Sequence, residues 1–219
     1  MTVTDVNVVK SAIFERPDDA NKGTLGSLLC VCGSYGMAGA AVMSAKGALR
    51  TGIGLAKCAL PRSIYPIVAQ TILESVYYPL SENADGRISK VNVPFLVSES
   101  CKSSATLVGC GLGVCDDTLK IVFSLIENSA TPLVLDADAL NCVAKQHEIL
   151  LRKKAPIIIT PHPGEMSRLT GLATPLVNAE RERVALDFAQ KYGVVTVLKG
   201  AGTVIASPNG KVLVNPTGN

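Results

Sequence analysis

Short apolar runs alternate with longer amphipathic segments along the chain from Ser27 onward. Residues 157–159 are three consecutive isoleucines, which is typical of a parallel strand covered on both faces. Apolar residues over 184–192 instead recur at helical spacing, opposite a charged face. This alternation predicts an α/β fold with a mostly parallel central sheet flanked by helices. We predict strands at 27–32, 54–61, 106–108, 132–135, 157–159 and 194–198, and helices at 40–50, 63–71, 119–126, 142–151, 165–169 and 184–192.

Two further segments complete the predicted architecture. Residues 203–214 are predicted to form a β-hairpin near the C-terminus, because Asn209-Gly210 is a favoured tight turn between strands. The first 22 residues are predicted to form an amino-terminal cover. The 219 residues fit one α/β domain with a sizeable core, so a single domain over 1–219 is expected.

Charge and cysteine usage exclude several classes of protein. The net charge is +3 and no run of lysines or arginines occurs, so the chain lacks the footprint of a nucleic-acid-binding protein. The seven cysteines form no Cys-x-x-Cys pair and no Cys/His cluster suited to zinc. Most are therefore expected to be small core residues. With no signal peptide and no long apolar span, we expect a cytoplasmic protein with no membrane partner.

An imidazole and a carboxylate follow the isoleucine strand. His162 lies between two prolines and Glu165 comes three residues later. Ligands of open α/β sheets bind at the carboxyl ends of strands, so both side chains are candidates for chemistry. Two interpretations of Glu165 stay open: it contributes to the site, or it only starts the next helix, where a carboxylate suits the helix dipole.

Glycine-rich turns follow three other predicted strands, at residues 33–39, 109–113 and 199–203. Such turns let backbone amides approach phosphate oxygens at the start of a helix. The 109–113 turn lacks the full dinucleotide fingerprint, and the chain contains no P-loop motif. Ligand contact and plain tight-turn geometry both remain open for the first two turns. Lys199 suits a nucleotide, but a solvated surface lysine is the alternative.

Asp136 and Asp138 follow the predicted strand at 132–135. One of them could hold a hydrated magnesium ion, which prefers carboxylate and phosphate oxygens. The alternative for Asp138 is that it caps the next helix. We favour a functional role for Asp136.

These motifs occur in an order that resembles the ADP- or ATP-dependent NAD(P)H-hydrate dehydratase family, whose fold is ribokinase-like with three layers. The resemblance covers almost the whole chain from Arg16. Its most specific parts are Asp136-Ala137-Asp138-Ala139-Leu140 and Thr160-Pro161-His162-Pro163-Gly164-Glu165-Met166. The other matching segments are 16–17, 21–26, 33–34, 39–41, 48–52, 111–113, 199–200 and 215–219. The epimerase domain that is often fused to such enzymes is not found in these residues.

The resemblance implies a repair reaction on hydrated NADH or NADPH. The added hydroxyl is phosphorylated by ADP or ATP with Mg²⁺, and phosphate then leaves far more readily than hydroxide would. The positions that match contacts to the hydrated cofactor are Gly39, Ala40, Gly113 and His162. Those that match the stretch around the adenine nucleotide are Lys199, Gly200, Ala201, Gly202 and Thr203. Glu165 and Asp136 resemble carboxylates near the magnesium ion, and Glu165 is also the one catalytic candidate within the chain.

One departure from the family pattern concerns the end of the sequence. Family members continue after Asn-Pro-Thr-Gly-Asn with a Gly-x-Gly-Asp turn that supplies an anion hole and the catalytic base. We expect that aspartate to lie beyond Asn219, so that the 219-residue chain alone shows negligible turnover. Apolar sheet surface left without covering helices would favour a homo-oligomer.

Two other functions compete with the repair reaction. The first is a ribokinase-like kinase that phosphorylates a small alcohol such as a sugar or vitamin precursor, for which the residue at position 162 is the discriminating feature. The second is a nucleotide-binding module without catalysis. An oxidoreductase is disfavoured by the incomplete glycine fingerprint.

Overall fold

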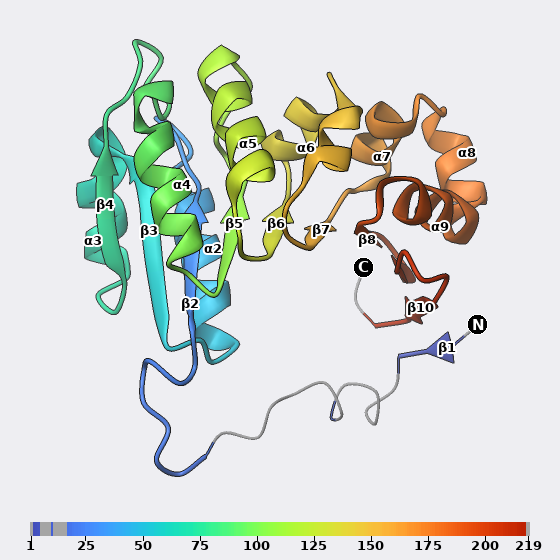
Figure 1. Cartoon of the computed structure of the whole chain (residues 1–219), viewed down its shortest axis with the longest axis horizontal. Helices are drawn as coiled ribbons and strands as arrows, with labels where there is room; N and C mark the ends of the chain where they lie inside the picture. The colour runs from blue at the N-terminus through green and yellow to red at the C-terminus, as the bar shows by residue number, and fades with distance from the viewer. Residues whose placement is uncertain (1, 5–9, 11–16, 218–219) are drawn as a thin grey trace. The chain divides into compact units, whose positions relative to one another are not determined.

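The computed structural model describes residues 2–4, 10 and 17–217, which form two compact units (Figure 1). Unit 1 comprises Met1–Ala20 and Ile158–Asn219, and unit 2 comprises Asn21–Ile157.

Unit 2 is built on a parallel sheet with the strand order β6-β5-β2-β3-β4. Parallel neighbours need long crossover connections, and helices supply them between successive strands. The strands are β2 (Ser27–Val31), β3 (Leu55–Pro61), β4 (Val76–Leu80), β5 (Ala105–Val108) and β6 (Leu133–Leu135). The helices are α2 (Ala38–Arg50), α3 (Tyr65–Thr71), α4 (Val93–Cys101), α5 (Asp116–Asn128) and α6 (Asp138–Val143), with 3-10 turns at Arg62–Ile64, Lys90–Asn92 and His147–Arg152.

Helices cover both faces of the unit 2 sheet, as Figure 1 shows. Alternate residues of β3 point to opposite faces, which is the strand periodicity of two. Cys58 packs in an apolar cluster with Ala45 of α2 and Val68 of α3. Its neighbour Lys57 points the other way and lies 3.7 Å from Glu99 of α4. The core of this unit is therefore divided between the two sides of the sheet.

Unit 1 is a mixed sheet with the strand order β1-β10-β9-β8-β7. β7 and β8 are parallel, and β9 is antiparallel to both of its neighbours, β8 and β10. The strands are β1 (Thr2–Val3), β7 (Ile157–Ile159), β8 (Val195–Leu198), β9 (Thr203–Ala206) and β10 (Val212–Asn215), and the helices are α7 (Pro163–Thr170), α8 (Thr174–Ala179) and α9 (Arg181–Tyr192).

The predicted fold class is confirmed: parallel strands alternate with helices, and β9 and β10 form the predicted hairpin, which turns at Asn209-Gly210. The amphipathic stripe at 184–192 is also confirmed, because Val184, Phe188 and Tyr192 are buried. The elements that were not predicted are β1, β4, α4, α8 and the 3-10 turn Lys90–Asn92. Most of the first 22 residues lie outside the described part, so the amino-terminal cover is not assessed. The single domain over 1–219 stays a prediction.

Candidate functional site

The turn after β7 places His162 at the N-cap position of helix α7, where its imidazole caps the helix. Nδ1 of His162 accepts hydrogen bonds from the backbone N–H groups of Gly164, at 3.0 Å, and of Glu165, at 3.3 Å. In return, Oε2 of Glu165 accepts a hydrogen bond of 2.9 Å from the backbone N–H of His162. The two residues thus form a capping box in which a histidine takes the place usually held by serine or threonine.

The capping box fixes the tautomer of the His162 imidazole. Because Nδ1 accepts hydrogen bonds, the proton of the neutral imidazole is on Nε2. Nε2 lies 3.4 Å from Oε1 of Glu165, and the His162 side chain is 51% exposed, whereas that of Glu165 is 6% exposed. A buried carboxylate therefore orients an imidazole that still reaches solvent.

The 199–203 turn joins β8 to β9 and is tied directly to the histidine turn. The backbone N–H of Lys199 donates a 2.8 Å hydrogen bond to the carbonyl of Pro161, the residue before His162. Within the turn, the hydroxyl of Thr203 donates to the carbonyl of Gly200 at 3.0 Å. Unit 1 therefore places the predicted nucleotide residues next to the predicted substrate histidine.

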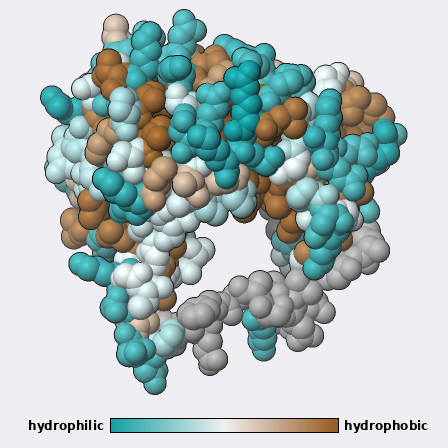
Figure 2. Space-filling view, viewed as in Figure 1, coloured by the Kyte–Doolittle hydropathy of each residue, from teal (hydrophilic) through white to brown (hydrophobic). Residues whose placement is uncertain are grey.

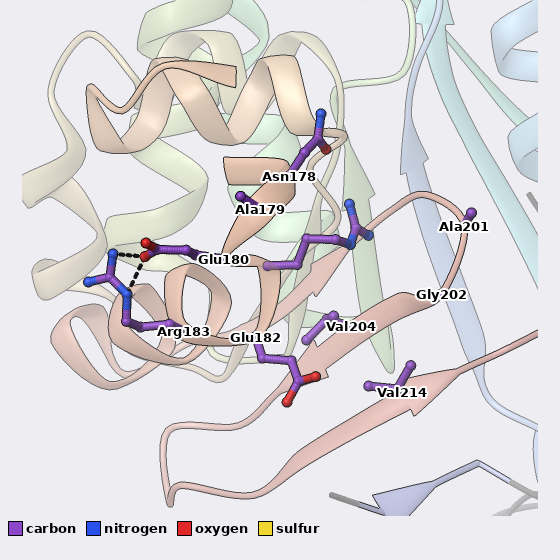
Figure 3. Close-up of a pocket in the computed structure, with 10 residues that line it drawn as sticks. Asn178, Ala179, Glu180, Glu182, Arg183, Ala201, Gly202, Val204 and Val214 are labelled. Atoms are coloured by element: carbon purple, nitrogen blue, oxygen red, sulfur yellow. Dashed lines mark hydrogen bonds and ion pairs between the residues drawn. The ribbon is translucent and has the colours of Figure 1, made fainter. Parts of the chain in front are cut away.

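A cavity of about 590 Å³ opens beside the 199–203 turn, a size within the usual range of small-molecule sites. Figure 3 shows Ala201 and Gly202 on the turn, with Val204 and Val214 on the hairpin strands. Arg181, the first residue of α9, also lines the cavity. Its Nε is buried and finds no acceptor among the described residues. A cavity of this size, lined by both charged and apolar residues, can hold a polar ligand such as an adenine nucleotide.

In unit 2, the 33–39 turn and the 109–113 turn are joined at the carboxyl ends of β2 and β5. The backbone N–H of Gly33 donates to the carbonyl of Cys110 at 2.8 Å, and the hydroxyl of Ser34 donates to the carbonyl of Gly111 at 2.8 Å. A Cβ at Gly111 would lie 2.7 Å from that of Ala40, so only glycine allows this approach. Ala40 and the 109–113 turn are therefore in contact, and Gly39 beside them is exposed.

The carboxylate of Asp138 holds the end of the 109–113 turn. Oδ2 of Asp138 accepts a 2.8 Å hydrogen bond from the backbone N–H of Gly113. Asp138 is the first residue of α6, whose N-cap is Ala137 and has no side-chain cap bond. The capping alternative for Asp138 is therefore wrong. The residue fixes the loop that carries Gly113 instead.

Asp136 lies at the end of β6 beside a strained residue. Its Oδ2 accepts a hydrogen bond from the thiol of Cys110 at 3.4 Å. Ala137, the next residue, has φ 48° and ψ −113°, and it is the only non-glycine residue with positive φ in the described part of the chain. Such strain persists only where the surroundings enforce it, and it clusters at functional sites.

The helix-start interpretation of Glu165 is confirmed by the capping box, which leaves its role as a metal ligand a prediction. Across the described residues, His, Cys, Asp and Glu side chains nowhere gather in threes as a protein-made metal site would require. Magnesium is commonly held by substrate phosphates and water instead, so an ion that arrives with the nucleotide needs no such cluster.

Arg181 was missed by the sequence analysis, which described a charged face of the 184–192 helix but did not single out this residue. The only signal was its position, three residues before the predicted amphipathic helix and 18 residues before Lys199. Of the described residues, none belongs to a helix with the length and hydropathy of a membrane span.

The fold and the strand-end turns define an α/β protein of the ribokinase-like class. A ribokinase-like superfamily protein from Enterococcus faecalis superposes with a TM-score of 0.83 at 20% identity, covering 100% of this chain and 72% of that one, which supports the fold alone. The family model for NAD(P)H-hydrate dehydratase matches residues 28–219. The chain therefore belongs to the NAD(P)H-hydrate dehydratase family.

Individual relatives agree with this assignment. The ADP-dependent (S)-NAD(P)H-hydrate dehydratase of Bacillus subtilis is 32% identical over 213 residues, which are 96% of this chain and 71% of that protein. The crystal structure of the Bacillus subtilis ADP/ATP-dependent NAD(P)H-hydrate dehydratase, co-crystallised with ATP/Mg²⁺, superposes with a TM-score of 0.81 at 29% identity, covering 100% of this chain and 73% of that one. The bifunctional NAD(P)H-hydrate repair enzyme Nnr of Thermofilum pendens is 39% identical over 204 residues, which are 93% of this chain but 39% of that protein.

Proposed function

We propose that this chain serves the nucleotide-dependent dehydration of hydrated NADH and NADPH, a repair of the nicotinamide cofactor. Its family membership and its likeness to the Bacillus subtilis dehydratase support the proposal. The structural observation that carries it is the 2.8 Å hydrogen bond from Lys199 to Pro161. That bond holds the exposed imidazole of His162 beside the glycine-rich 199–203 turn, as a reaction between a bound alcohol and a nucleotide requires.

The proposed cofactor is ADP or ATP with Mg²⁺, which when bound supplies the phosphoryl group that turns a poor leaving group into a good one. The chain's own residues bind and orient. His162 is the proposed substrate contact through the exposed part of its ring, which is held in a single tautomer because the backbone N–H groups of α7 occupy Nδ1. Glu165 keeps the ring in place.

Residues 199–203 are the proposed contacts to the adenine nucleotide. The turn has two glycines with positive φ, Gly200 and Gly202, so its backbone is free of side chains on either side of Ala201. The Lys199 ammonium is suited to a phosphate. The cavity beside the turn supports the placement of a ligand of this size.

Gly39, Ala40 and Gly113 are the proposed contacts to the hydrated cofactor. Gly39 and Ala40 lie in the first turn of α2, and Gly113 lies on a loop that the carboxylate of Asp138 holds. Small residues at these positions allow the backbone to approach a ligand closely. Asp136 is the proposed carboxylate nearest the magnesium ion.

We also propose that the protein works in the cytoplasm and forms a homo-oligomer. All seven cysteines are free thiols, which supports a reducing compartment. Light scattering coupled to gel filtration would give the oligomeric state.

The test of the proposed function is a dehydration assay with the product of the complete reading frame that encodes this chain. Hydrated NADPH is mixed with ADP or ATP and Mg²⁺, and the return of the near-ultraviolet absorbance of reduced nicotinamide is followed. We expect absorbance to return only when nucleotide is present. Phosphorylation of small alcohols while the hydrate is ignored would refute the proposal in favour of a kinase.

A further inference from the structure

Arg181 is held in a position that costs free energy. It is the first residue of α9, and a cation at a helix N-terminus is repelled by the helix dipole. Burial lowers the pKa of its guanidinium. Its Nε is buried without an acceptor among the described residues. Among the described residues no carboxylate forms an ion pair with Arg181, since those of Glu180 and Asp187 pair with Arg183 instead.

What Arg181 does contact is the end of strand β8. Its Nη2 donates hydrogen bonds to two successive carbonyls, those of Leu198 at 2.8 Å and Lys199 at 3.1 Å. A planar guanidinium is suited to hold two neighbouring acceptors in a fixed orientation. The direction in which the chain leaves β8 and enters the 199–203 turn is therefore fixed by one side chain from α9.

The same guanidinium restricts residue 200. Gly200 has φ 144°, and a Cβ there would lie 3.0 Å from Nη1 and 3.1 Å from Nη2 of Arg181. The arginine and the glycine thus form a matched pair: the side chain occupies the space that the missing Cβ leaves. Arg181 also lines the cavity together with Ala201 and Gly202. The same side chain therefore forms part of the cavity wall and restricts the conformation of the turn.

From this geometry we propose that Arg181 is a positioning residue of the adenine-nucleotide site, which it serves by holding the 199–203 turn in its binding conformation. This inference rests on the proposed function. An arginine that is repelled by the helix dipole and has no ion pair lowers the stability of the fold. We expect such a residue only where it contributes to function.

The experiment compares Arg181→Met with Arg152→Met. Arg152 is not among the residues that line the cavity, and its exposed guanidinium pairs with Glu127 at 3.0 Å. Isothermal titration calorimetry with ADP and with ATP, each with Mg²⁺, gives Kd for the 219-residue chain. Urea unfolding without nucleotide gives the free energy of unfolding for each variant.

We expect Arg181→Met to weaken nucleotide binding by about tenfold to hundredfold, the usual loss for hydrogen bonds made by a charged group. Arg152→Met should change Kd by less than about threefold, since its exposed ion pair lies outside the cavity lining and contributes little. The urea midpoint of the nucleotide-free Arg181→Met chain should match that of the unaltered chain, because a costly arginine has been removed. Arg181→Lys should recover only part of the affinity, because the ammonium group of lysine lacks the planar set of N–H donors of a guanidinium.

Three results would overturn the inference: an unaltered chain that binds neither nucleotide, an Arg181→Met variant whose Kd stays within about twofold of the original, or a loss of affinity that only follows a loss of stability. Failure of the proposed function gives a different pattern. In that case the unaltered chain binds nucleotide and the Arg181 variant does not, while the hydrate assay of the complete product stays silent.

Discussion

At the residue scale, His162 combines a structural contact with the ligand contact proposed for it. It caps helix α7 through Nδ1, while about half of its side chain stays exposed. Histidine is an unusual cap because its acceptor nitrogen must be deprotonated to receive the helix N–H groups. The capping role and the proposed ligand contact can be separated by substitution, because only the first depends on an acceptor at the Nδ1 position.

Two substitutions of His162 separate them. His162→Asn keeps an acceptor near the Nδ1 position, so we expect the free energy of unfolding to stay within about 0.5 kcal/mol, whereas His162→Ala should lower it by about 1 kcal/mol. Both variants lose Nε2, so both should bind NADPH, as an analogue of the hydrate, more weakly. Urea unfolding and calorimetry measure the two effects. If His162→Asn binds NADPH as well as the original chain does, His162 is only a helix cap.

At the element scale, helix α4 is fastened to the unit 2 sheet by one buried carboxylate. Glu99 accepts a hydrogen bond from Lys102 at 3.0 Å and one from the hydroxyl of Tyr78 on β4 at 3.1 Å, and it lies 3.7 Å from Lys57 on β3. The hydrogen bond from Lys102 is the main cause that lowers the pKa of Glu99 below its ordinary value.

This pKa shift predicts a pH dependence of stability. A carboxyl whose pKa is lower in the folded state stabilises the fold fully above its unfolded pKa of about 4.3, and that contribution is lost as pH falls through the folded value. Glu99→Gln should therefore lower the free energy of unfolding by roughly 1–3 kcal/mol at neutral pH and have less effect in acid. Urea unfolding over a pH series measures it. Glu127→Gln, at an exposed pair with Arg152, is the control.

If the loss caused by Glu99→Gln were the same at every pH, the carboxylate charge would not be the source of the stabilisation. A pronounced loss in the Glu127 control would point instead to a general effect of removing surface charge.

The elements that the sequence failed to predict share a physical cause. Strand β4 contains Pro79, which would be excluded from a central strand because it cannot donate to the ladder. In unit 2 that strand pairs only with β3 and is an edge strand, where proline is tolerated. Helices α4 and α8 are short and begin with proline in their first turn. Their apolar periodicity is too brief to stand out, whereas the buried stripe of α9 was clear from Val184, Phe188 and Tyr192.

Residues of the candidate site could be predicted where their type and their position after a strand indicate chemistry. They could not be predicted where their role depends on a tertiary contact. His162, Glu165 and the 199–203 turn follow predicted strands, and the structure joins them through the bond from Lys199 to Pro161. The hydrogen bond from the backbone N–H of Gly113 to the carboxylate of Asp138 joins residues 25 positions apart, and the role proposed for Arg181 depends on where its helix packs. Contacts of that kind have no local pattern in the sequence.

At the scale of the whole molecule, thiol reactivity reports how completely the chain is folded. Cys30, Cys32, Cys58 and Cys142 are buried, and Cys101 is exposed. Burial raises the pKa of Cys142 to about 12, and it raises that of Cys30 as well, so these two thiols form little reactive thiolate.

We expect the exposed Cys101 and the partly exposed Cys110 and Cys115 to react in the native protein, and the four buried thiols to react only after unfolding, measured with a chromogenic disulfide reagent. Cys101→Ser should remove one of the three native-state reactions and leave the four buried thiols to react with unfolding. Rapid reaction of more than three thiols in the native state would show that the core around α2 and β3 is open.

The contact between Arg181 and Gly200 limits which residues the 199–203 turn can accept. Gly200 and Gly202 have positive φ, and Gly200 is also confined by the guanidinium. Ala201 between them is exposed and under no such restraint. Of these three positions, residue 201 is therefore the one that a library can randomise without disturbing the backbone of the turn.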